Sequence, residues 1–198
     1  MITKVLVSGI LTILYSASMF GWGRMFEMVI GVRLPWPLTL IHGLAVLLAL
    51  GGALNLVGIA YSETLDAIVV LGLGLAVLLP WLALKSSAID VKSLMPSAQE
   101  LRAWAIPALF IITVFAFIDT TQVPPSAFNF HDDFEKYLTF PVRMLATGTL
   151  QAGPFSALGG QTLGGQAFLQ GFVLAHWPLG TVNAVDALFA PTMCLLLP

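Results

Sequence analysis

Long apolar runs without a charged side chain constrain this chain more than any other feature. Residues 38–60 form such a run of 23 residues, and residues 5–22 and 67–84 form two more of 18 residues each. An α-helix needs about 20 mostly apolar residues to cross the hydrocarbon core of a bilayer. Only 9% of the residues are charged and 58% are apolar, whereas a soluble domain carries about 25% charged residues. The pattern predicts an all-α membrane protein, a polytopic bundle of transmembrane helices with the lipid bilayer as its partner.

Two further apolar runs complete the predicted organisation. Residues 101–118 form a fourth span, with Arg102 in its first turn and Pro107 inside it. A fifth run begins near Ala184 and stops at Pro198, so we expect this chain to be the N-terminal fragment of a longer protein. The four predicted transmembrane helices lie at about 5–22, 38–60, 67–84 and 101–118. A loop with juxtamembrane helices follows at 119–183, and a fifth span starts at 184–198.

The distribution of basic residues predicts the topology. Five of the eight Lys and Arg residues lie in the connections after the first and third spans or at the edge of the fourth: Arg24, Arg33, Lys85, Lys92 and Arg102. The positive-inside rule assigns these connections to the cytoplasm, and the N-terminus and residues 119–183 to the extracytoplasmic side. Ser16-Ala17-Ser18 could be the cleavage site of a signal peptide. Removing the first span would move the Arg24 connection outside, so the uncleaved interpretation is favoured.

Small and polar residues mark the second and third spans. Small residues repeat every four positions on one face of each span, which allows another helix to approach closely: Ala45, Ala49 and Ala53, and Gly72 and Ala76. His42 lies about one turn inside its span, where it can reach the interface, and an intramembrane histidine is a functional candidate. Asn55 is more typical of a hydrogen bond between helices than of a ligand-binding residue.

The strongest chemical signal lies at residues 129–138, which hold three of the ten acidic residues and one of the three histidines. One interpretation of these acidic residues is purely structural. Asp132 and Glu135 are spaced as a helix N-cap and its capping-box partner. The apolar positions that follow predict an amphipathic helix on the membrane surface, which Pro141 bends and Gly148 ends.

A functional interpretation uses the same residues differently. One carboxylate is sufficient for a cap, and this segment supplies two adjacent ones, Asp132 and Asp133, with His131 before them. Paired carboxylates can hold a divalent cation such as Mg²⁺ or Mn²⁺ through oxygen ligands. Alternatively, one of them can take the proton from an acceptor hydroxyl as a general base. The spacing alone leaves the structural and functional interpretations open.

A glycine-rich stretch follows at residues 153–166, with five glycines in fourteen positions. It leads into a helical-looking stretch at 167–177, and a glycine-rich turn before a helix presents backbone N–H groups that can hold phosphate. It is not a Walker A loop, because no Gly-Lys-Ser/Thr follows. A flexible re-entrant loop is the alternative. Residues 167–177 are too few to span a bilayer, so we expect them to lie at the interface or dip into it.

The order of these parts resembles the C-type (GT-C) integral membrane glycosyltransferases, in which membrane helices are followed by an outside loop that opens with acidic residues. The amino-acid sequence from His131-Asp132-Asp133-Phe134 to Gly148 also resembles that of a group of uncharacterised bacterial polytopic membrane proteins related to these enzymes. The resemblance covers roughly residues 100–190 and the span pattern before them. In these glycosyltransferases the acidic residue of the first outside loop binds metal or activates the acceptor. Their donor is a sugar on a polyprenyl-phosphate lipid.

The resemblance implies a membrane-embedded glycosyltransferase with Asp132 and Asp133 as its catalytic and cation-binding residues. Candidate substrate-binding residues accompany this pair: His131, Glu135, Arg143, Gly164 and Gly165. A transporter or flippase, or a membrane protein without catalytic activity, is the alternative, and a transporter would use polar residues inside the spans such as His42 and Asn55. The eight basic residues form no patch, which argues against nucleic acid as a partner. The sugar, the acceptor and the oligomeric state stay open.

Overall fold

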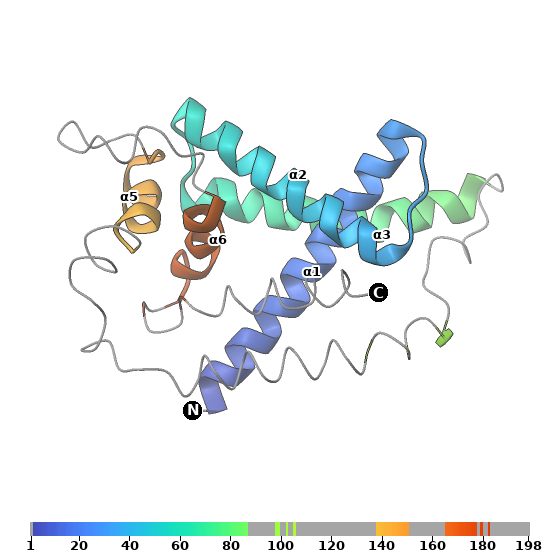
Figure 1. Cartoon of the computed structure of the whole chain (residues 1–198), viewed down its shortest axis with the longest axis horizontal. Helices are drawn as coiled ribbons and strands as arrows, with labels where there is room; N and C mark the ends of the chain where they lie inside the picture. The colour runs from blue at the N-terminus through green and yellow to red at the C-terminus, as the bar shows by residue number, and fades with distance from the viewer. Residues whose placement is uncertain are drawn as a thin grey trace.

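The computed structural model describes residues 2–86, 138–150 and 165–177, together with 98, 99, 102, 105, 179 and 182. Every regular element in this part of the chain is helical, with no strand, which confirms the predicted all-α class. The helices are three long ones and two short ones (Figure 1): α1 (Ile2–Ile30), α2 (Trp36–Val57), α3 (Ser62–Ser86), α5 (Thr139–Thr147) and α6 (Gly165–Leu174).

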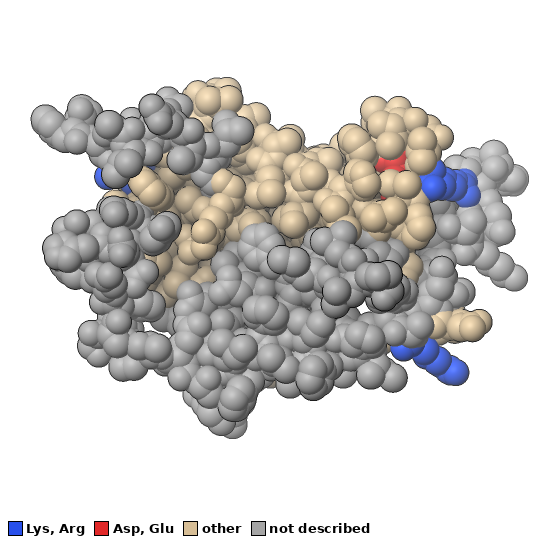
Figure 2. Space-filling view, viewed as in Figure 1, with Lys and Arg blue, Asp and Glu red and all other residues tan. Residues whose placement is uncertain are grey.

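Two stretches of the described helices are long and apolar enough to cross a membrane: Leu38–Val57 of α2 and Ser62–Leu82 of α3. They overlap the second and third predicted spans. In Figure 2 the coloured charged side chains lie toward the two ends of the face, and the tan surface between them carries none. The first predicted span lies inside α1, which continues to Ile30. Apart from residues 102 and 105, the predicted spans at 101–118 and 184–198 lie outside the described residues.

The helix α1 is the centre of the bundle. It packs along both α2 and α3, which contact each other far less (Figure 1). A Cβ atom on Gly43 of α2 would overlap the carbonyl oxygen of Met19, and one on Gly72 of α3 would overlap the hydroxyl oxygen of Ser18. The indole N–H of Trp22 donates to the carbonyl of Ile68 across the second interface, at 3.0 Å. Both interfaces therefore bring backbones into contact, as small residues allow.

The two small-residue predictions have different outcomes. Gly72 lies against α1 as expected. In contrast, Ala45, Ala49 and Ala53 of α2 are exposed in the described part of the chain, so that prediction does not hold there. The buried face of α2 instead carries Gly43 and other residues four positions apart, Leu47 and Gly51. The physical reason is that α1 approaches α2 to backbone contact, and a glycine allows a closer approach than an alanine.

The helix α6 enters the bundle instead of lying on its surface. Seven consecutive residues from Ala167 to Val173 are buried. The ring of Phe168 fills the space over Gly51 of α2, and the ring of Phe172 meets Tyr15 of α1 edge-on, with centroids 5.1 Å apart. A helix that is apolar on nearly all sides is stable only when it is buried on nearly all sides. The structure therefore places α6 inside the helix bundle, packed against α2, α3 and α5.

The helix α5 fits its predicted C-terminal limit. Gly148 caps it in the left-handed region, at φ 77°, with its N–H bonded to the carbonyl of Met144 at 2.8 Å. Pro141 lies in the first turn, where a helix does not use the missing N–H, so it interrupts no helical hydrogen bond. The amide of Ala60 donates to the carbonyl of Gly148 at 2.8 Å. The end of α5 is thereby attached to the connection between α2 and α3.

Candidate functional site

The structure describes two of the seven residues that the sequence singles out as site residues. Arg143 lies in the middle of α5, and Gly165 is the first residue of α6, against Leu48 of α2. These two helices pack against each other. The remaining candidates lie outside the described residues: His131, Asp132, Asp133, Glu135 and Gly164.

Asn55 fixes where the α5 segment meets the bundle. Its side-chain oxygen accepts the backbone N–H of Leu150 at 2.6 Å and the hydroxyl of Thr149 at 3.2 Å. Asn55 is buried, at 2% exposure. Asn55 was expected to form a hydrogen bond between helices; it forms one, but with the turn that follows α5 and not with a helix. Together with the Ala60 contact, it places α5 at the end of the bundle where α2 joins α3.

An apolar hollow opens at this end between α5 and the C-terminal part of α6. Its volume is about 480 Å³, and its lining consists of aliphatic residues and one tryptophan: Val142, Leu145, Ala146, Leu174, Trp177 and Leu179. Such a lining offers a charged group no partner, but it can take up hydrocarbon surface from water. The hollow is therefore suited to an apolar chain.

Arg143 lies between residues that line this hollow. It follows Val142 and is one turn from Ala146 on α5, and its side chain is partly exposed. Its Nη1 atom is buried without a hydrogen-bond partner among the described residues. A guanidinium group stays charged and presents paired N–H donors that match the oxygens of phosphate or carboxylate. The helix α5 thus carries a cation between two residues that line the apolar hollow.

The same end of the bundle holds a histidine–carboxylate pair that the sequence did not point out. The Nε2 atom of His176, in the turn after α6, lies 2.8 and 2.9 Å from the two carboxylate oxygens of Asp66, in the second turn of α3. The side chains are 52% and 44% exposed. Because a carboxylate only accepts hydrogen bonds, Nε2 is the nitrogen that donates to Asp66, and in the neutral form of the ring Nδ1 is the acceptor.

No local pattern joins Asp66 to His176, since 110 residues separate them. Each of the two residues has only a weak functional signal in the sequence. His176 is one of only three histidines, and Asp66 is an acidic residue at the entrance of an apolar run. Only the burial of α6 brings the two together.

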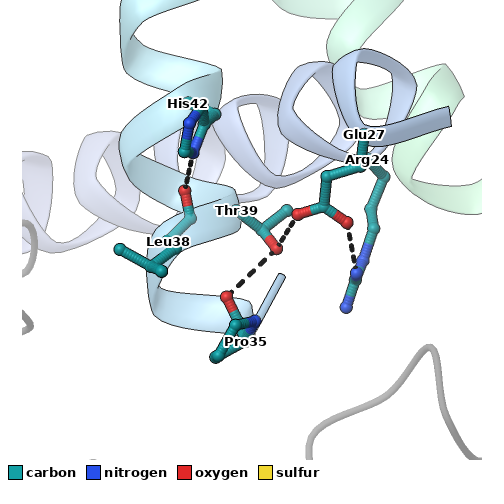
Figure 3. Close-up of polar contacts among 6 residues, drawn as sticks. All are labelled: Arg24, Glu27, Pro35, Leu38, Thr39 and His42. Atoms are coloured by element: carbon teal, nitrogen blue, oxygen red, sulfur yellow. Dashed lines mark hydrogen bonds and ion pairs between the residues drawn. The ribbon is translucent and has the colours of Figure 1, made fainter. Parts of the chain in front are cut away.

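A second polar cluster lies at the opposite end of α2, beside the connection to α1 (Figure 3). Arg24 and Glu27 form a buried ion pair, with Nη1 and Oε2 2.6 Å apart. The hydroxyl of Thr39 donates to the other carboxylate oxygen at 2.5 Å. Arg24 was predicted to lie in a connection, but α1 continues past it to Ile30. Glu27, one turn later, supplies the opposite charge that the burial of Arg24 requires.

His42 belongs to the surroundings of this cluster. Its Nδ1 atom lies 2.7 Å from the carbonyl of Leu38, one turn earlier in α2 (Figure 3), and its ring stacks on Phe26 of α1 at a centroid distance of 5.4 Å. These contacts fix the ring at the interface between α1 and α2. The cluster therefore acts as a polar connection between these helices.

The described residues contain no group of three or more His, Cys, Asp or Glu side chains that could hold a metal ion. The predicted cation ligands Asp132 and Asp133 lie outside the described part.

No family model matches the chain, and no curated protein and no solved structure is detectably similar to it.

Proposed function

We propose that this chain belongs to a membrane-embedded enzyme that transfers a sugar from a polyprenyl-phosphate donor to an acceptor outside the cytoplasm. One observation carries the proposal: an apolar hollow lies at one end of a bundle of apolar helices, and Arg143 is on α5 between two of the residues that line it. A lipid-linked sugar donor needs this combination, since its isoprenoid chain is apolar and its phosphate is anionic.

The proposed orientation follows from the two ends of α2. Its N-terminal end adjoins the connection that carries Arg33 and the last turns of α1 that carry Arg24, and the positive-inside rule assigns such an end to the cytoplasm. Its C-terminal end holds α5 through Asn55 and Ala60. If α2 spans the membrane, then α5, the hollow and the end of α6 are on the extracytoplasmic side of a bacterial inner membrane.

Asp132 and Asp133 complete the proposed site. They come six and five residues before Leu138, where the described α5 segment begins. In this proposal the pair holds Mg²⁺ or Mn²⁺ against the donor phosphate, or one member takes the acceptor proton. In the same proposal Arg143 also binds the phosphate. The proposal assigns further contacts with the substrate to four other residues: His131, Glu135, Gly164 and Gly165.

The experiment that tests the proposal replaces the acidic pair in the complete protein. Asp132→Asn and Asp133→Asn should each reduce the glycan product in the cell envelope at least 100-fold, the scale on which a lost catalytic group acts. Mass spectrometry of envelope glycans in a deletion strain carrying each variant measures the product. Asp119→Asn, at the start of the same segment, is the matched control and should leave the product unchanged. Normal product from both pair variants, inserted at wild-type levels, would exclude the proposal.

A transporter is the second candidate, and the burial of α6 favours it. Transporters use short, interrupted helices whose ends lie inside the membrane at the substrate site. The helix α6 begins beside Leu48, near the middle of α2, and the turn after it contacts Asp66 on α3. If the protein is a transporter, His42→Ala should change the rate at which a lipid-linked sugar is transported into vesicles, and Asp132→Asn should not. The glycosyltransferase proposal predicts the opposite sensitivities.

A further inference from the structure

The pair formed by His176 and Asp66 has the geometry of an oriented general base. Asp66 holds the Nε2–H of His176 with both carboxylate oxygens, at 2.8 and 2.9 Å. No described residue is hydrogen-bonded to Nδ1. The His176 side chain is 52% exposed, so that a reactant can reach this nitrogen. A carboxylate that fixes the tautomer and orientation of a histidine leaves the other ring nitrogen ready to take a proton.

A purely structural role explains the pair poorly. Ion pairs between side chains that are about half exposed stabilise a fold very little. The helix α6 is held instead by the burial of Phe168, Phe172 and Val173, which are each at most 1% exposed. The amide of His176 is already bonded to the carbonyl of Val173. The turn is therefore formed without the contribution of the imidazole ring.

The position of His176 connects the pair to the hollow. Leu174 and Trp177, on either side of it in the sequence, both line the hollow between α5 and α6. A lipid chain in the hollow would have its head group close to this turn. We propose that His176, oriented by Asp66, takes the proton of the acceptor hydroxyl during sugar transfer; this inference rests on the proposed function.

The inference assigns separate roles to groups that the sequence left interchangeable. The acceptor oxygen forms a bond to the anomeric carbon of the sugar, and its proton passes to Nδ1 of His176. The bond between that carbon and the phosphate oxygen breaks, and polyprenyl phosphate leaves with the electron pair. The proton on His176 is then released to water. Asp132 and Asp133 are left as ligands of a divalent cation, because the proton already has an acceptor.

The test uses the complete protein in lipid nanodiscs, with Mg²⁺ and a panel of synthetic short-chain polyprenyl-phosphate sugars. Release of labelled sugar from the lipid, to water or to an added alcohol, is the readout. His176→Ala should reduce kcat about 100-fold or more, in the range of a lost general base, with little change in KM. Added imidazole should restore part of that loss. Asp66→Asn should also lower kcat, because it removes the carboxylate that fixes the ring.

His176→Gln separates chemistry from folding. Its amide nitrogen can still donate to Asp66, so the contact between α6 and α3 is kept, but the side chain cannot accept a proton as imidazole does. It should lose kcat as the alanine variant does, and imidazole should not restore it because the glutamine fills the site. A glutamine variant within three-fold of wild type would overturn the inference and leave the proposed function intact. So would a defect in His176→Ala that imidazole fails to repair. Loss of all sugar release in the wild type itself would overturn both.

Discussion

At the scale of single residues, Asn55 makes the contact that decides where the α5 segment ends. Its side-chain oxygen is the acceptor for the N–H of Leu150, a residue that is 1% exposed. A buried amide N–H without an acceptor is costly, because it has lost its hydrogen bond to water. One polar side chain in an apolar helix therefore attaches a segment 95 residues later, together with the bond between Ala60 and Gly148.

Asn55→Ala should lower the free energy of unfolding by about 1–2 kcal/mol, since the Leu150 amide is left buried without a partner. The same change should increase hydrogen exchange at that amide. Denaturation in mixed detergent micelles and exchange mass spectrometry measure the two effects. Leu56→Ala is the control, because Leu56 is 63% exposed on the next position of α2. Equal exchange at Leu150 in both variants would show that Asn55 does not hold the segment.

Some residue roles could be predicted from the sequence and others could not. Gly148 was recognised as a helix end because a left-handed cap leaves a local signature, a glycine after an amphipathic stretch. Asn55 was recognised as a hydrogen-bonding residue because an amide inside an apolar run needs a partner. The partner itself was not predictable, and neither was the pairing of Asp66 with His176. Both depend on how distant segments pack.

At the scale of elements, the interfaces of α1 depend on glycines in the partner helices. Gly72 of α3 faces Ser18 and Trp22 of α1 with no room for a Cβ atom, whereas a Cβ atom on Gly74 would meet nothing within 4 Å. The two glycines are two residues apart on one helix. They provide a matched pair in which only one substitution changes packing.

Gly72→Ala should destabilise the protein by about 1–3 kcal/mol, because α1 and α3 must separate to admit the methyl group. Gly74→Ala should be neutral or stabilise by about 0.5–1 kcal/mol, since alanine is the better helix former. Unfolding of the purified variants in detergent micelles gives both values. If the two alanine variants lost stability equally, the close contact between α1 and α3 would be disproved.

The element-scale predictions from the sequence were limited by what a one-dimensional pattern can specify. Apolar length identified the second and third spans, because crossing a bilayer sets a minimum number of residues. The same argument could not decide whether α6 lies on the surface or inside, since a short apolar helix suits both. The four-residue spacing of small residues predicted that the alanine face of α2 is the packed one, whereas the face with Gly43 and Gly51 is buried. Either face satisfies a spacing of four.

At the scale of the whole molecule, the two ends of the bundle are chemically different. One end holds the buried pair of Arg24 and Glu27 with Thr39. The other end holds α5, the apolar hollow, and the pair of Asp66 and His176. The proposed reaction needs the second end to face outward, where a lipid-linked sugar is used and the acceptor is found. The account depends on this orientation.

Cysteine labelling in right-side-out membrane vesicles tests the orientation most directly. With Cys194 replaced by serine, Ala146→Cys reports the end that holds the hollow and Val32→Cys reports the connection between α1 and α2; both positions are exposed. A membrane-impermeant maleimide should label Ala146→Cys in sealed vesicles, and Val32→Cys only after permeabilisation. Labelling of Val32→Cys in sealed vesicles, with Ala146→Cys protected until they are opened, would place the hollow in the cytoplasm and contradict the account.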